Sequence, residues 1–177
     1  MASDNSIFKK RLRLTIKWFL YTLVLVAAHV VGQNADLFEF SGVRPVLILP
    51  VAICVAMFEH EFPGGLFAAA AGILWGLSSD AVFGYYAILL LVLGVTAGLI
   101  CSYVLRPTLL TSLLLCGLGS LFVALFDFFF FYVIWSYDGL MMFFTACMLP
   151  TVAITAVSVV PCFLVVRFIS RKLQPPK

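Results

Sequence analysis

Few side chains in this 177-residue chain could do chemistry, and most of them stand alone. Its five cysteines are scattered through apolar runs, with no CxxC pair and no neighbouring histidine. A zinc site needs closely spaced cysteine and histidine ligands, and a disulfide framework needs paired cysteines in a secreted chain. We therefore interpret all five as small apolar helix residues: Cys54, Cys101, Cys116, Cys147 and Cys162.

The densest group of polar side chains is Glu59-His60-Glu61. Two carboxylates beside an imidazole suggest a metal site, but adjacent residues on a short turn rarely converge on one ion. We expect a solvated cytoplasmic turn instead. The sequence contains no GxSxG, no HExxH and no Walker lysine loop, and it has only two histidines. Because these motifs carry hydrolytic and phosphate chemistry, we expect no enzymatic activity, no cofactor and no metal.

Asp127 is the one acid well inside an apolar run, within Leu-Phe-Asp-Phe-Phe-Phe-Phe-Tyr. A carboxylate inside a membrane is a functional hypothesis by default, because burial without a partner is unfavourable. Asp127 lies about two turns before Trp135. It is therefore expected either to reach interfacial water or pair with His29, or to hold an ion or substrate. We interpret the aromatic run from Phe122 to Trp135 as an interfacial belt.

The composition indicates in what class of protein these residues are positioned. Hydrophobic residues make up 64% of the chain and charged residues 11%, and the mean hydropathy is +1.16. A soluble domain carries about 25% charged residues. There is too little polar surface here to cover a water-soluble globule, so the outer surface must face lipid and the chain is an integral membrane protein.

A membrane-spanning helix needs about 20 predominantly apolar residues. We predict an all-α bundle of six transmembrane helices in one domain, with a basic tail at 1–13, the bundle at 14–170 and a second tail at 171–177. The first helix is expected to be a retained signal anchor. The six segments are Lys17–Val31, Arg44–Phe58, Gly64–Ser79, Gly84–Leu105, Thr108–Trp135 and Leu140–Phe168.

The second and third segments are short, each nearer 16 residues than 20. They form either a re-entrant hairpin or two full crossings. A hairpin would place the charged turn Glu59-His60-Glu61 inside the hydrocarbon, where each charge is costly. Two crossings, with local thinning of the bilayer, are therefore favoured.

Lysine and arginine indicate the orientation, because cytoplasmic loops carry an excess of them. With the N-terminus inside, Arg44 is the one basic residue outside, while the acids Asp36, Glu39, Asp80 and Asp138 also fall outside. Both ends of the chain are therefore expected in the cytoplasm. The ten basic residues on that side are Lys9, Lys10, Arg11, Arg13, Lys17, Arg106, Arg167, Arg171, Lys172 and Lys177.

Small residues recur at four-residue spacing along two of the predicted helices. Residues at that spacing lie along one helix face, so another backbone can approach closely, which is how helices associate in lipid. Such a face either packs against a neighbouring helix of the same chain or docks a helix of a partner. The residues concerned are Gly64, Ala68, Gly72 and Gly76 in one helix and Gly94 and Gly98 in the next.

The stretch Gly42–Arg106 resembles the bacterial rod shape-determining protein family MreD. The family begins with a basic residue and proline before an aliphatic run, followed by a glycine-rich helix ending in Asp, a brief turn and another glycine-bearing helix. The matching parts here are Arg44-Pro45-Val46-Leu47-Ile48-Leu49, then Gly65-x6-Gly72-x3-Gly76-x3-Asp80, then Phe83-Gly84-Tyr85-Tyr86, and then Gly94-x3-Gly98. The charged break at residues 59–61 and Asp127 depart from the family's pattern.

The resemblance implies a non-enzymatic scaffold of the cell-elongation machinery that directs peptidoglycan synthesis, in the bacterial plasma membrane. Such proteins bind the bitopic protein MreC and, through it, the MreB filament, RodA and its transpeptidase partner. The cytoplasmic basic patches would face anionic lipid or partners, with no role for nucleic acid. A competing hypothesis is the substrate-binding subunit of an energy-coupling-factor vitamin transporter, which has similar size and small-residue faces. A small channel or proton-coupled carrier is a third.

Overall fold

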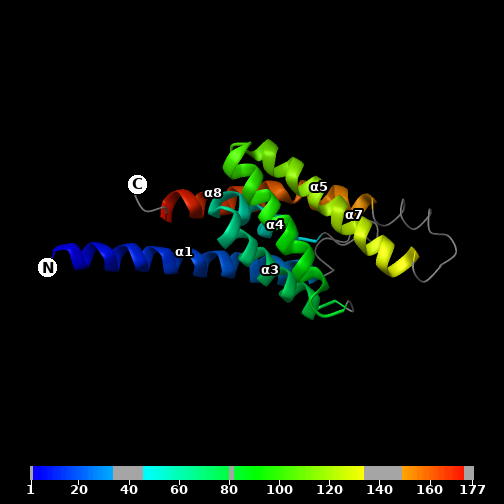
Figure 1. The fold of residues 1–177 in the computed structure, drawn as a ribbon, viewed down its shortest axis with the longest axis horizontal. Coiled ribbons are helices and arrows are strands. Elements are labelled where there is room, and N and C mark those ends of the chain that lie inside the picture. Colours follow the sequence, from blue (N-terminus) through cyan, green and yellow to red (C-terminus); the bar gives the residue numbers. More distant parts are fainter. Residues whose placement is uncertain (1, 34–45, 80–81, 134–148, 174–177) are drawn as a thin grey trace.

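The computed structural model describes residues 2–33, 46–79, 82–133 and 149–173, and every element in these ranges is a helix (Figure 1). Four of the helices are long and apolar enough to cross a membrane: Arg11–Gln33, Tyr85–Tyr103, Leu109–Phe130 and Pro150–Lys172. The predicted all-α class is confirmed, and the two short segments are indeed shorter apolar helices. The elements are α1 (Ala2–Gln33), α2 (Ile48–Glu59), α3 (Glu61–Leu77), α4 (Tyr85–Tyr103), α5 (Leu109–Asp127), the π-helix η2 (Phe128–Val133), α7 (Leu149–Val157) and α8 (Val159–Leu173).

Local sequence explains where several helices begin and end. The Thr108 hydroxyl caps α5 by accepting a hydrogen bond from the Thr111 amide, as threonine does at helix N-termini. The last predicted segment, Leu140–Phe168, is interrupted at Ser158 in its described part, because α7 ends at Val157 and α8 starts at Val159. Pro161 causes this break, since its ring has no N–H to offer the Val157 carbonyl four residues earlier.

Helix α2 is the centre of the bundle. All ten residues from Ile48 to Met57 are buried, and the helix packs against α1, α3, α4, α5, α7 and α8. Twelve residues span only about 18 Å, less than the roughly 30 Å of a bilayer's hydrocarbon core. Because the other helices surround α2, it does not have to match the lipid thickness itself. Its sequence is therefore apolar on every side, as expected for a fully buried helix.

The outside of the bundle is apolar as well. Large hydrophobic side chains point outward from every long helix, among them Phe19 on α1, Ile88 on α4, Leu118 on α5 and Phe168 on α8, each more than 60% exposed. A soluble protein would not leave contiguous surface of this kind uncovered. The exterior is therefore that of a protein in contact with lipid.

Helices α3 and α4 form the most extensive helix pair, and glycines bring their backbones together. A Cβ built on Gly72 would lie 2.6 Å from the Ala87 Cα, and one on Gly98 would lie 2.7 Å from the Glu61 Cα. A Cβ on Gly94 would lie 2.5 Å from the Ala68 Cβ. Side chains at these glycine positions would therefore force the two helices apart.

The one-residue turn between α2 and α3 is equally tight. His60 has a positive φ of 69°, a conformation uncommon for a residue with a side chain. The Gly64 amide donates to the His60 carbonyl at 3.1 Å. A Cβ on Gly64 would lie 2.6 Å from the Ala56 Cα of α2. The absence of a side chain at Gly64 thus lets α3 fold directly back along α2.

We expect Gly72→Ala to lower the free energy of unfolding by about 1–3 kcal/mol, because the added methyl group meets the α4 backbone, which cannot move aside cheaply. Gly76→Ala is the matched control. No described atom lies within 4 Å of its added Cβ, and alanine favours the helix by up to about 1 kcal/mol. Thermal unfolding in detergent measures both variants, and equal melting of the two would contradict the packing described here.

Candidate functional site

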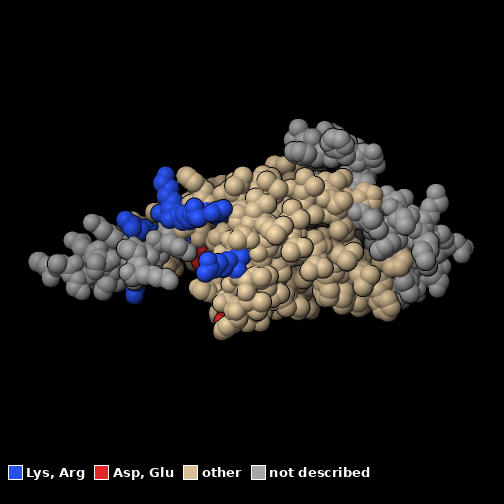
Figure 2. Space-filling view, turned by 90° about the horizontal axis from the view of Figure 1, so that it is seen from above, with Lys and Arg blue, Asp and Glu red and all other residues tan. Residues whose placement is uncertain are grey.

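Polar side chains inside the bundle gather in two layers, one near each end. The end at which α1 enters the bundle and α8 finishes (Figure 1) is called the basic end from here on. Among the described side chains on the face in Figure 2, Lys and Arg lie over this end. The opposite end is called the far end. At the basic end, Glu59 of α2 contacts Tyr21 of α1, and Glu61 at the start of α3 contacts Ser102 near the end of α4. At the far end, Ser78, just after α3, contacts His29 of α1, and Tyr86 at the start of α4 contacts Asp127 at the end of α5. Helices α2, α3, α4 and α5 therefore each run opposite to the helix before them.

At the basic end, Lys17 of α1 forms an ion pair with Glu59, the last residue of α2. The two side chains are only 8% and 11% exposed. The fully buried Tyr21 donates its hydroxyl to Glu59 Oε1 at 2.9 Å, and Ser170 of α8 lies beside Tyr21. Lys17 and Tyr21 are four residues apart and share one face of α1. This cluster therefore ties α1 to α2 and α8.

Glu59 needs these partners for a second reason. A carboxylate at the C-terminus of a helix meets the negative end of the helix dipole, which is unfavourable.

The neighbouring residues of the turn bind a different helix. Ser102 of α4 donates to Glu61 Oε2 at 3.2 Å and lies 3.4 Å from His60 Nδ1. The expectation of a simply solvated turn is therefore wrong for Glu59.

At the far end, Asp127 is held by tyrosines of α4. The Tyr86 hydroxyl donates to Asp127 Oδ2 at 3.3 Å, and Tyr85 lies close to the same carboxyl group. Trp75 of α3 stacks on Tyr86, with ring centroids 4.1 Å apart and planes 14° from parallel. Asp127 is also the last residue before the π-helix, and such distortions occur frequently at functional sites.

His29 has a different partner from the one considered for it. Its Nε2 lies 3.1 Å from the hydroxyl of Ser78, the residue after α3, while the carboxyl group of Asp127 binds Tyr86. The structure thus gives His29 and Asp127 separate partners on neighbouring helices. Asp80, which the sequence places beside Ser79, lies outside the described residues.

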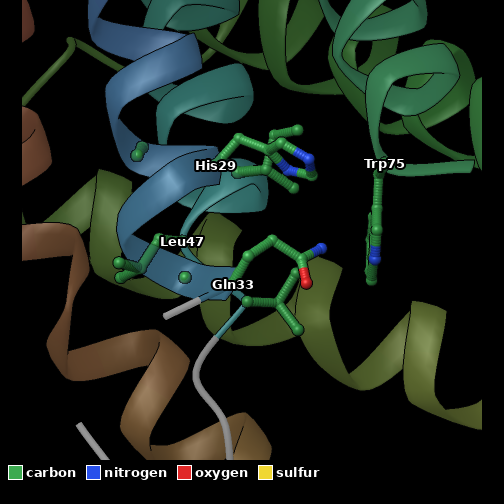
Figure 3. A pocket seen from close by; sticks show the side chains of 8 residues that line it. His29, Gln33, Leu47 and Trp75 are labelled. Carbon is green, nitrogen blue, oxygen red and sulfur yellow. The ribbon is translucent and has the colours of Figure 1, made fainter. Parts of the chain in front are cut away.

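A small cavity of about 140 Å³ opens between α1, α3 and the start of α2 at the far end. His29, Gln33, Leu47 and Trp75 are among its lining residues (Figure 3). The amide of Val46, at its edge, donates to the Thr155 hydroxyl of α7 at 3.2 Å. Pockets that enclose drug-sized ligands measure roughly 300–1,000 Å³. The cavity has room for one amino-acid side chain or a few waters.

The small residues predicted as a contact face are used within the chain. Gly64 faces α2, whereas Ala68, Gly72, Gly94 and Gly98 lie in the interface of α3 with α4 and the turn before α3. Gly76 is buried but has open space beside it. In the described part of the chain, no group of three or more His, Cys, Asp or Glu could hold a metal ion.

The residues that sequence reasoning missed are Lys17 and Tyr21. A signal for them existed, because Lys17 opens the first apolar segment and Glu59 closes the second. In an antiparallel pair those two ends meet on one side of the membrane. Lys17 was considered only as a marker of orientation, so its role as the partner of Glu59 was not predicted.

No family model, no curated protein and no solved structure matches the chain.

We expect Lys17→Met or Glu59→Gln alone to cost about 3–5 kcal/mol of unfolding free energy, because each leaves the other charge buried without a partner. The double variant removes both charges and should lose less than either single variant. Denaturant titration in detergent measures the unfolding free energies of the two single variants and the double variant. The exposed Lys172→Met is the control, expected within about 0.5 kcal/mol of wild type. Additive losses would contradict the buried pair.

Asp127→Asn should leave stability and the surroundings of Trp75 nearly unchanged, because an amide oxygen still accepts the Tyr86 hydrogen bond. Asp127→Leu should cost about 1–3 kcal/mol, since it leaves that hydroxyl without its acceptor. Unfolding curves and tryptophan emission report both effects, with Trp18 and Trp135 replaced by Phe. If Asn were as damaging as Leu, the charge itself would matter and Asp127 would be an ion site.

Proposed function

We propose that the chain is a non-enzymatic membrane scaffold of the bacterial cell-elongation machinery, acting in peptidoglycan synthesis and binding an MreC-like bitopic partner. The observation that carries this proposal is the position of the MreD-like segment. Its described residues form α2, α3 and α4, and Gly64, Gly72 and Gly98 within it lie against backbone atoms of a neighbouring helix or turn. Several residues that carry the resemblance, Gly72 and Gly98 among them, are thus ones on which the packing depends.

We further propose six membrane crossings with both ends of the chain in the cytoplasm. The antiparallel order of the helices supports this count, with α2 and α3 as the two short crossings. The basic end would be cytoplasmic, because Lys and Arg accumulate on that side of membrane proteins. The far end, with Asp127 and His29, would then face the side on which peptidoglycan is assembled.

Of the two uses considered for the glycine face, packing within the chain accounts for most of it. Most of the glycine face is occupied by α2 and α4, so it is not available to a partner helix. We propose that the partner contacts the outward apolar side chains of the bundle instead. In lipid such association depends on close packing and polar contacts, since burying apolar surface brings no hydrophobic gain there.

The competing proposal is a vitamin-binding transporter subunit, and the far-end cavity is the observation in its favour. Its place near His29, Gln33 and Trp75 suits a ligand arriving from outside. Its volume of about 140 Å³ is less than half of what drug-sized ligands need, and a vitamin is of that size. This cavity alone is therefore too small to enclose a vitamin.

Affinity purification of the tagged full-length chain from membranes should bring down an MreC-like protein with its elongation partners, and depletion of the chain should round rod-shaped cells. An unrelated tagged six-span membrane protein, solubilised in the same detergent, serves as the control. A vitamin bound to the purified chain, or copurification with a pair of ATPases, would instead identify it as a transporter subunit.

A further inference from the structure

We propose that the far-end cavity binds a compact primary ammonium group, carried either by a free small amine or by the ethanolamine headgroup of a lipid. This inference does not depend on the scaffold function. It rests on the size of the cavity and on the groups that line it, and on the charges of the described residues at that end of the bundle.

Trp75 forms one wall of the cavity with a face of its indole ring. Figure 3 shows this ring nearly edge-on, with one face turned toward His29 and Gln33. Tyr86 stacks on Trp75 with ring centroids 4.1 Å apart. Because Tyr86 is not among the described residues that line the cavity, it covers the opposite face. The stack thus fixes the orientation of Trp75 and leaves the cavity face for a ligand. The face of a tryptophan ring attracts cations.

His29 offers this ligand an acceptor. A serine hydroxyl has one hydrogen, and the Ser78 hydroxyl donates it to backbone carbonyls of α3, with the Trp75 oxygen nearest at 3.0 Å. The Ser78 oxygen therefore accepts a hydrogen bond from Nε2 of His29, 3.1 Å away. A neutral imidazole that donates from Nε2 carries its lone pair on Nδ1. Nδ1 of His29 can accordingly accept a hydrogen bond from an ammonium group.

Gln33 provides a second acceptor. Its side-chain amide points toward Trp75 across the cavity (Figure 3), and an amide oxygen accepts hydrogen bonds. Gln33 is also the last residue of α1, which has no basic side chain in its last turn. The last carbonyls of a helix lack donors within the helix and form the negative end of its dipole. An ammonium group, with three donors and a positive charge, suits two acceptors and an aromatic face.

The described charges also favour a cation at the far end. Every lysine and arginine in the described ranges lies at the basic end or on the part of α1 that precedes it. Asp127 lies at the far end and is connected to Trp75 through Tyr86. The start of α2 brings the positive end of a dipole to the cavity. Its first turn is weakened as an anion site, however, because Pro50 has no N–H.

The size of the cavity limits the ligand to a few heavy atoms. Its volume is about 140 Å³, and a protein cavity of about 150 Å³ can hold benzene. Gln33 is exposed, while His29 and Trp75 are half-buried, so a ligand can enter from the surface where the α1 span ends. Ethanolamine is small enough for this site. The same group on a phospholipid could enter it with the phosphate remaining outside.

The test uses the full-length chain in a neutral detergent, with Trp18 and Trp135 replaced by Phe so that Trp75 alone emits. Titration with ethanolamine hydrochloride at neutral pH and constant ionic strength should change this emission saturably. Ethylene glycol, which replaces the ammonium group by a hydroxyl, should not. Gln33→Leu should weaken binding about tenfold, as expected for the loss of a hydrogen bond to a charged group. Ala28→Leu should abolish binding, because Ala28 lines the cavity.

Ser79→Ala is the matched control. It removes a hydroxyl at the same end that bonds to the Gly76 carbonyl of its own helix and does not line the cavity, so affinity should stay within about twofold. Equal binding of ethylene glycol, a preference for acetate over ethanolamine, or wild-type affinity in Ala28→Leu would each overturn the site. Unchanged melting of the variants separates these results from misfolding.

The source of the ammonium group is decided by a second titration. Short-chain phosphatidylethanolamine that binds more tightly than ethanolamine, while phosphatidylcholine of the same chains does not bind, would support a lipid headgroup. Ethanolamine that binds at least as tightly as the lipid would support a free amine. Because purified chain is used without any partner, failure of either titration leaves the scaffold proposal to its own test.

Discussion

Close approach of the α3 and α4 backbones is the contact on which the rest of this structure depends. In lipid there is no hydrophobic gain in bringing two apolar helices together, so van der Waals packing must hold them. Glycine at positions 72, 94 and 98 removes the side chains that would keep the backbones apart. The pair then forms one wall against which the short helix α2 packs. Without that wall, a 12-residue helix would not be shielded from lipid or from water.

The polar layers at the two ends fix the helices that glycine does not. At the basic end, Lys17, Tyr21 and Glu59 hold α1 in register with α2. At the far end, Trp75, Tyr86 and Asp127 connect α3, α4 and α5. Buried polar contacts of this kind specify one arrangement because any other register leaves a charge or hydroxyl without a partner. Packing thus provides the attraction between helices, and these contacts select one register.

Much of the fold was predictable from local signals, and the remainder was not for physical reasons. Arg106-Pro107 and Thr108 predicted the boundary between α4 and α5, and the charged break at residues 59–61 predicted the turn before α3. The effect of Pro161 on the last helix was also local, but it was overlooked. Four-residue spacing indicated that Gly72 faces a helix, yet spacing alone cannot say which one. The partners of Lys17, His29 and Asp127 lie on other helices, and one sequence carries no record of such long-range contacts.

Cross-linking of α3 to α4 within one chain tests this packing most directly. A Cβ built on Gly65 lies 3.7 Å from the Val95 Cβ, within the 3.5–4.5 Å separation typical of disulfides. In a chain whose five natural cysteines are replaced by alanine, Gly65→Cys with Val95→Cys should therefore cross-link readily in membranes treated with an oxidant. Leu66→Cys with Val95→Cys should not, because Leu66 points outward. Cross-linking of the Leu66 pair without the Gly65 pair would contradict the account.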